Sequence, residues 1–282
     1  MNGVRIVIGL ILSALIAGCG GGGSSATDTA SSSPVIPTVL GAEGVYLGTF
    51  SDGRAHETVI LETGQIYMIY GSRTNTILQE TGLIEGLGSV NAGIFSSIDA
   101  RDFANSVVIA NFPAFQDIVS DQVFPVSISA NYTTNGSFNG SISESGTTVA
   151  GNALVQPSTT TFTGTRPDKS LYDYEEPADL SHVVGSWGQI TVLAVTSEGR
   201  ISLSSRDCAA EGTIKPRAAG KNLFDIEWSF VAIPACPFYG QTIKSIGFAR
   251  SLEAGSLQVR GQFIIFNTDS ARTKKRNYIF YR

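Results

Sequence analysis

The sequence predicts an all-β fold of two small antiparallel modules, each a barrel or a sandwich, behind an N-terminal leader and a flexible tether. Three observations lead to this prediction: several stretches alternate apolar and polar residues, turn signals recur between them, and 31 of the 282 residues are glycine. Alternation with a period of two places one set of side chains on a core and the other in water, as in antiparallel sheets. Barrels and sandwiches both fit this pattern, and the choice between them stays open.

The first 18 residues have the organisation of an export signal. Met1–Arg5 carries one positive charge, Ile6–Ala17 is uncharged and mostly aliphatic, and Ile16-Ala17-Gly18-Cys19 follows. This order resembles bacterial lipoprotein precursors, which implies cleavage after Gly18, diacylation of the Cys19 thiol and acylation, for example with palmitate, of the new amino group. A membrane-spanning helix is the alternative, but the apolar run is shorter than the roughly 20 residues that spanning requires.

Residues 19–42 are expected to form the tether, because they are rich in Gly, Ser, Thr and Ala and too poor in apolar residues to fold. In lipoproteins of the enteric type, aspartate after the modified cysteine signals retention in the inner membrane. This chain has Gly20 there, so the resemblance implies the outer membrane of a Gram-negative envelope. Two or three acyl chains make such an anchor effectively permanent. Whether the protein faces the periplasm or the cell surface stays open.

The first β module is expected over residues 43–166. Its clearest strands are expected at Val126–Thr133, Ser137–Ile142, Thr148–Leu154 and Thr159–Thr163. Helix-like spacing is scarce, and Ser97–Asn105 is expected to form one or two helical turns. Asp99 and Asp102 are expected to pair with Arg101 beside them or to cap that helix.

A linker is expected over residues 167–183, where the alternation stops and acidic residues crowd around Pro167 and Pro177. A solvated linker fits this composition, and Pro177–Val184 fits a short helical turn that starts with proline. A calcium site is the alternative, although the acidic spacing matches no EF-hand loop.

The second β module is expected over residues 184–282. One face is formed by Ile226, Trp228 and Phe230, and another by Leu257, Val259, Gly261, Phe263 and Ile265. Cys208 and Cys236 are the two cysteines left after Cys19, and in an exported chain they are expected to form a disulfide; two free buried thiols are the alternative. Arg272, Lys274, Lys275 and Arg276 are expected to form a hairpin turn before a final strand. A cationic patch for lipopolysaccharide or an acidic protein is the alternative.

Both modules begin alike, with Gly44-Val45-Tyr46 and Gly185-Ser186-Trp187. The aromatic residue is expected to plug one end of a small barrel, with the glycine leaving room for it. Together with Gly44–Phe50 as a whole and Phe162–Thr165, these segments resemble a group of uncharacterised proteobacterial lipoproteins with two β-rich halves, and this resemblance brings no known activity. More distantly, Gly-x-Trp resembles lipocalin barrels, and two barrels on a lipid tether resemble transferrin-binding protein B. Neither likeness identifies ligand residues.

Residues for catalysis are scarce. The two histidines, His56 and His182, limit general base chemistry. His56-Glu57 lacks the second histidine of a zinc protease, and no Gly-x-Ser-x-Gly elbow accompanies Asp179, Ser181 and His182, which fit a capping role better. We therefore expect no enzyme, no metal site and no cofactor.

The charge balance limits the partners. The chain has 19 Lys and Arg against 24 Asp and Glu, a net charge of −5. Without a basic stripe, nucleic acid is not expected as a partner. The expected function is a lipid-anchored, non-catalytic envelope module that binds a protein or a small apolar ligand; a structural or assembly role in the outer membrane is the alternative. A continuous apolar cavity would indicate the small ligand, whereas a filled interior with an exposed aromatic patch would indicate a protein.

Overall fold

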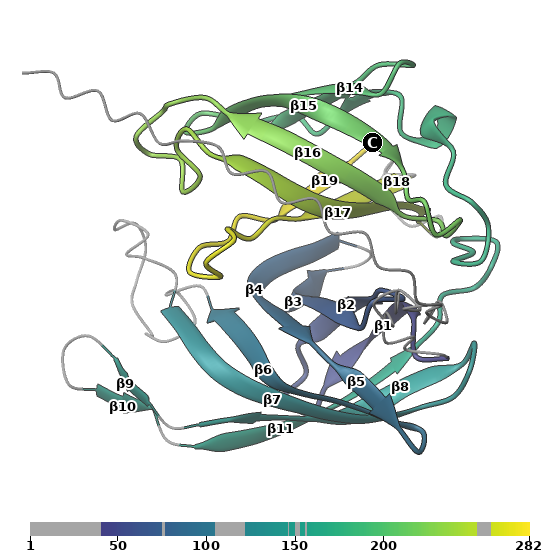
Figure 1. Cartoon of the computed structure of the whole chain (residues 1–282), viewed down its shortest axis with the longest axis vertical. Helices are drawn as coiled ribbons and strands as arrows, with labels where there is room; N and C mark the ends of the chain where they lie inside the picture. The colour runs from purple at the N-terminus through teal and green to yellow at the C-terminus, as the bar shows by residue number, and fades with distance from the viewer. Residues whose placement is uncertain are drawn as a thin grey trace, which may run out of the picture. The chain divides into compact units, whose positions relative to one another are not determined.

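The computed structural model describes residues 41–74, 77–104, 122–145, 147–149, 153–155, 157–252 and 261–282. The regular elements in these ranges are β-strands and one 3-10 turn, Leu180–His182. The predicted all-β class is therefore confirmed, and the strands form two barrel-like antiparallel sheets (Figure 1). The expected signal peptide, Cys19 and the tether up to residue 40 lie outside the described residues.

The first sheet is an up-and-down barrel of eight main strands. They are β1 (Gly44–Phe50), β2 (Ala55–Ile60), β3 (Gln65–Thr74), β4 (Ile77–Leu87), β6 (Ile94–Ala104), β7 (Gln122–Tyr132), β8 (Ser137–Glu144) and β11 (Ser158–Thr165). Each pairs with the next, β4 pairs with β6, and β11 returns to β1, which closes the ring. The short β5 (Ser89–Asn91) extends the pairing along β6, and β9 (Thr147–Val149) and β10 (Ala153–Val155) form a separate hairpin.

Three of the strands expected in the second half of this module correspond to β7, β8 and β11. The single strand expected at Thr148–Leu154 is wrong, because β9 and β10 are two short strands that pair with each other. The helical turns expected at Ser97–Asn105 are wrong, because the described part of that segment belongs to β6. The register of β6 against β7 shifts between Ser97 and Ala100. This β-bulge breaks the period of two and leaves Ile98 91% exposed, so the apolar–polar alternation typical of a strand is absent from the sequence there.

The second sheet runs in chain order through eight strands. They are β12 (Gly185–Trp187), β13 (Val192–Val195), β14 (Arg200–Ser204), β15 (Ala209–Pro216), β16 (Phe224–Phe230), β17 (Thr242–Ser251), β18 (Gly261–Phe266) and β19 (Tyr278–Tyr281). The outer strands β12 and β19 meet where Gly188 N donates a hydrogen bond of 3.1 Å to Tyr281 O. This sheet therefore rolls into a barrel whose last seam is joined only at one end.

The predicted face of β16 is confirmed, since Ile226, Trp228 and Phe230 are buried and alternate with more accessible residues. In β18 the predicted face is confirmed, since Phe263 and Ile265 both lie in the core of the second barrel. The exposure expected for the opposite face is wrong, because Gln262 and all other residues of β18 are buried. Leu257 and Val259 lie outside the described residues.

Three hydrophobic clusters explain this burial. One fills each barrel, and the third joins outward-facing residues of both barrels, for example Val59 and Leu83 of the first with Phe248 and Ile264 of the second. β2 and β18 are buried on both faces because one face lines a barrel and the other enters the shared cluster. Tyr172 and Tyr174, from the segment expected as a linker, are also buried in that shared cluster.

Candidate functional site

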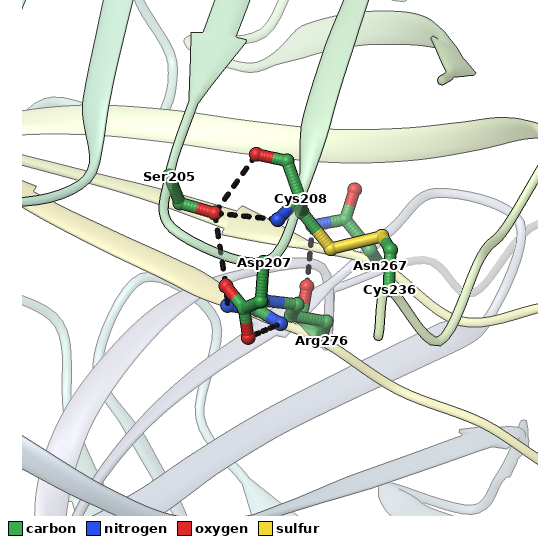
Figure 2. The surroundings of a disulfide bond; sticks show 6 residues. All are labelled: Ser205, Asp207, Cys208, Cys236, Asn267 and Arg276. Carbon is green, nitrogen blue, oxygen red and sulfur yellow. Dashed lines mark hydrogen bonds and ion pairs between the residues drawn. A yellow bond between two sulfur atoms is a disulfide. The ribbon is translucent and has the colours of Figure 1, made fainter. Parts of the chain in front are cut away.

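Cys208 and Cys236 form the predicted disulfide (Figure 2). Cys208 directly precedes β15, whereas Cys236 lies in the loop between β16 and β17. Their Cα atoms are 4.9 Å apart, and both residues are buried in the core of the second barrel. The disulfide therefore holds the β16–β17 loop against the barrel, and Phe238 from the same loop packs on Phe230 with ring centroids 5.1 Å apart.

A charged contact continues from the disulfide to the last hairpin. Arg276 donates to the two carboxylate oxygens of Asp207 at 2.8 and 2.7 Å (Figure 2). These hydrogen bonds lower the pKa of Asp207. Asn267 Nδ2 donates to Arg276 O at 2.7 Å and so holds Arg276 within the hairpin that carries β19. The pair of Arg276 with Asp207 then fixes the turn before Cys208 to this hairpin.

The basic segment near the C-terminus forms the predicted hairpin turn, with Thr268 opposite Lys275. Its charges are largely used inside the protein. Lys275 is buried and pairs with Glu80, and Arg272 pairs with Asp99 at 3.0 Å. With Arg276 on Asp207, three of the four cations already have acidic partners, so this segment is a poor receptor for an anionic partner.

The two barrels share an arrangement at the end where each begins. Tyr46 Oη donates to Ala42 O at 2.9 Å, and Trp187 Nε1 donates to Val183 O at 2.8 Å, each reaching four residues back along the chain. The guanidinium of Arg166 lies 5.7 Å from the Tyr46 ring centroid. We call this the aromatic–arginine lock of the first barrel.

The second barrel repeats this lock. Arg282, which follows its last strand as Arg166 follows β11, lies 3.9 Å from the Trp187 ring centroid. Arg282 donates to Val184 O, just as Arg166 donates to Glu43 O, and each of these carbonyls directly precedes the first glycine of its barrel. The two modules therefore begin and end alike. Gly44 leaves space for the Arg166 side chain, because a Cβ on residue 44 would lie only 2.7 Å from Arg166 Nη2.

A buried ion cluster joins the two barrels. Glu57 of β2 is fully buried, and its Oε1 accepts hydrogen bonds from Arg73 of β3 at 2.8 Å and from Arg250 of β17 at 3.0 Å. Gln262 of β18 is buried beside the same oxygen. Because a buried charge needs a close counter-charge, this cluster fixes β2 against β17.

Bulky side chains fill both barrel interiors. The fully buried side chains of the largest volume in these two clusters are Tyr46, Tyr70, Phe95, Phe138 and Phe162 in the first and Trp187, Phe224, Trp228, Phe238 and Phe263 in the second. A cavity at the mouth of the first barrel measures about 40 Å³, which holds about two or three waters. In the described structure this cavity is too small for an apolar ligand, and the interior of the second barrel is packed with buried aromatic side chains.

Two carboxyl groups line that small cavity. Asp102 Oδ1 accepts a hydrogen bond of 2.7 Å from Tyr70 Oη, and burial raises the pKa of Asp102 to about 7. Burial also raises the pKa of Glu144. Asp99 and Asp102 thus do not pair with Arg101 as expected, because the bulge directs Asp99 to Arg272 and places Asp102 in the barrel.

The histidines and the Asp179–His182 segment do not form a catalytic group. His56 is fully buried between Thr58 Oγ1 (2.9 Å) and Thr163 O (3.0 Å), and burial lowers its pKa to about 4. Asp179 accepts from Ser181 N at 2.8 Å, which is the predicted capping role. Within the described residues, no three His, Cys, Asp or Glu side chains are placed to hold a metal ion.

An open groove of about 860 Å³ lies where β12 and β19 diverge. One wall is the edge of β19, with Tyr278, Ile279 and Phe280, and the other is Gln189–Thr191, which follows β12. Ile190 is 91% exposed at its rim. Its lining combines aliphatic, aromatic and polar residues, among them Ile77 of β4.

Sequence reasoning missed the ion cluster and the groove. Glu57 and Arg250 are 193 positions apart, and no local pattern relates them. The lock left a signal, since an arginine directly follows the last strand of each barrel, at Arg166 and Arg282. The sequence signal for the groove is weaker. After Tyr46 the strand pattern continues through Leu47–Phe50, whereas after the equivalent Trp187 it is interrupted by Gly188-Gln189-Ile190-Thr191.

The described part of the chain has no helix long and apolar enough to cross a membrane. The chain matches no protein-family model, no curated protein and no solved structure.

Proposed function

We propose that the protein is a lipid-anchored, non-catalytic lipoprotein of the bacterial outer membrane that binds a partner protein through the outer surface of its barrels. The anchor is the lipid on Cys19, and the tether is the segment from there to residue 40. It is two residues shorter than expected, because Ala42 is buried in the core of the first barrel. Anchoring and location rest on the N-terminal sequence pattern alone, and the mode of binding rests on the geometry of the barrels.

The observation that carries the protein partner is the filling of both barrels by aromatic side chains. A barrel that carries a small apolar ligand needs a pocket of several hundred Å³. The 40 Å³ cavity is far below that size and is lined by Asp102 and Glu144. An accessible recess with a partly apolar lining is the groove beside Ile190, formed by the outside of the second barrel and by Ile77 of the first.

Several features support a non-catalytic role. His56 is neutral at pH 7 because its pKa lies at about 4, and its two ring nitrogens already have partners. Glu57 is buried, and one of its carboxylate oxygens pairs with the protein's own Arg73 and Arg250. His56 and Glu57 are fully buried, which keeps both side chains away from a substrate in solution.

The anchor is tested by comparing the parent with Cys19→Ser in cell fractionation. We expect the parent to fractionate with outer membranes and the variant to remain unprocessed or to be released from them. A variant that is processed and fractionates like the parent would contradict the lipid anchor. Protease treatment of intact cells then decides which side of the membrane the barrels occupy.

Partner binding is tested by affinity purification of the tagged full-length protein from detergent-solubilised envelopes after chemical cross-linking. We expect one envelope or external protein in stoichiometric amount. The Cys19→Ser variant purified from the soluble fraction serves as a control for proteins that associate through the lipid. Recovery of a small lipophilic molecule without any protein would refute the proposal.

A further inference from the structure

We propose that the open seam of the second barrel binds an extended segment of the partner protein as an added β-strand, antiparallel to β19. This inference rests on the proposed function and specifies where the partner binds and in which conformation. It is carried by a comparison of the two barrels, by the free edge of β19 and by the groove beside it.

The first barrel shows what a complete seam contains. β1 and β11 pair over four positions, from Leu47 opposite Thr165 to Phe50 opposite Phe162. Leu47 follows the lock residue Tyr46, and Thr165 precedes the lock residue Arg166.

The second barrel begins its seam in the same way and then stops. Gly188 follows Trp187, Tyr281 precedes Arg282, and Gly188 N donates to Tyr281 O, so this contact is equivalent to Leu47 opposite Thr165. The next three pairs of the first barrel have no counterpart between β12 and β19 in the described structure.

The chain leaves the seam at Gly188. This glycine has φ of +80°, and a Cβ on it would lie 2.2 Å from Thr191 O, so only glycine fits this tight turn. Gln189–Thr191 therefore bends away from β19 and becomes the far wall of the groove. The separation of the two walls is built into the backbone.

The edge of β19 presents unpaired backbone groups to that groove. Gly261 and Arg282 exchange both backbone hydrogen bonds, at 3.0 and 3.1 Å. In an antiparallel pair the bonded residues alternate, so Phe280 and Tyr278 also face β18, whereas Tyr281 and Ile279 direct N–H and C=O away from it. Within the described residues, β18 is the one strand paired with β19. An open edge of this kind accepts an added strand.

The groove also indicates the chemistry of the segment. In the first barrel the strand that fills this place buries Phe50 inside and exposes Thr49. The equivalent place in the second barrel is lined by Phe280, Ile279 and the exposed Ile190. We infer a segment with one apolar side chain directed into the groove and polar neighbours on either side. A free chain end or a long loop can enter between the two walls. The β19 strand of a second copy would not fit there, because its barrel would collide with Gln189–Thr191.

The test places a photo-cross-linking amino acid, p-benzoylphenylalanine, at Ile190 of the full-length protein in cells. The matched control is the same amino acid at Ile98, which is equally exposed at 91% but lies on the bulge of β6. We expect cross-links to the partner from position 190 and none from position 98, with the cross-linked residues of the partner confined to one short segment.

Two variants then test the strand itself. Ile279→Pro removes one outward N–H without removing a bond to β18, and Ile190→Lys places a charge at the rim; each is expected to weaken partner binding about five- to tenfold. Ile98→Lys is expected to bind like the parent, and melting curves identify any variant that has lost its fold. Hydrogen exchange on the purified complex is expected to show new protection at the Ile279 amide, which does not depend on the variants folding.

The outcomes separate the two proposals. A partner that binds folded Ile190→Lys and Ile279→Pro like the parent, or that cross-links from position 98 alone, overturns the added strand and leaves protein binding standing. A protein that captures no partner under any condition overturns both.

Discussion

Replacing Glu57 with glutamine is expected to lower the free energy of unfolding by about 3 kcal/mol. Glutamine keeps the shape of the side chain but removes its charge, which leaves Arg250, only 6% exposed at its side chain, without a counter-charge. Breaking a buried ion pair in this way costs about 3–5 kcal/mol. Arg73 is 27% exposed and recovers part of its hydration, so we expect the lower end of that range.

Urea denaturation followed by circular dichroism measures this loss. A thermal melt should show the same effect as a shift of about 2–4 °C for each kcal/mol. The control is Lys169→Ala, which removes the pair between Lys169 and Asp173, where the lysine side chain is 77% exposed. Exposed pairs contribute little, so this variant should lose less than about 1 kcal/mol.

A double-mutant cycle with Arg250→Met separates the pair from the other effects of each substitution. Because the two side chains are in direct contact, we expect a coupling energy of about 1–3 kcal/mol. A loss below about 1 kcal/mol for Glu57→Gln, together with no coupling to Arg250, would refute the view that this cluster holds β2 against β17.

Three further predictions concern stability. The pKa of Asp102 is raised to about 7 from an ordinary 3.8, so the folded state binds this proton more tightly than the unfolded state does. As pH rises from about 4 to 7, the free energy of unfolding therefore falls by at most about 1.4 kcal/mol per pH unit. Asp102→Asn should therefore be more stable than the parent at pH 8 and lose this slope in urea titrations; an unchanged slope would contradict the assignment. Cys208→Ser/Cys236→Ser should lose about 3–4 kcal/mol in the same assay, and a loss near zero would show that the disulfide does not constrain the unfolded chain. Arg282→Ala should lose about 1–2 kcal/mol and shift the fluorescence of Trp187, because a cation–π contact and two hydrogen bonds from the guanidinium to backbone carbonyls disappear. Arg200→Ala, an exposed change in the same barrel, should do neither.

Sequence reasoning succeeded where one face of a strand meets water. In β7 the segment Val126–Tyr132 alternates strictly, because inward residues such as Ile128 are buried and the residues between them are accessible. β16 behaves in the same way. The disulfide was also predictable, since export leaves these two cysteines to pair.

The same reasoning failed where both faces of a strand are covered. β2 contains three consecutive polar residues, His56, Glu57 and Thr58, which lie on alternating faces of the strand, yet all three are buried. The burial of Glu57 depends on β17 and β18, which lie about 190 to 210 residues later in the chain, as the bonds from Arg250 and Gln262 show. His56 is buried inside the first barrel instead, where its ring packs on Phe50 and Phe162. A period-of-two pattern reports which face meets the strand's own barrel and carries no information about a second barrel packed on the other face.

The two barrels differ at the seam, and the disulfide offsets that difference. The first barrel closes with four residue pairs between β1 and β11, whereas the second keeps only the contact of Gly188 with Tyr281. Three missing pairs correspond to about three backbone hydrogen bonds, worth about 3 kcal/mol in total at about 1 kcal/mol each. The Cys208–Cys236 bond contributes about 3–4 kcal/mol to the same barrel. A barrel stabilised in this way can keep an edge of β19 open without losing its fold, and an open edge is what an added strand requires.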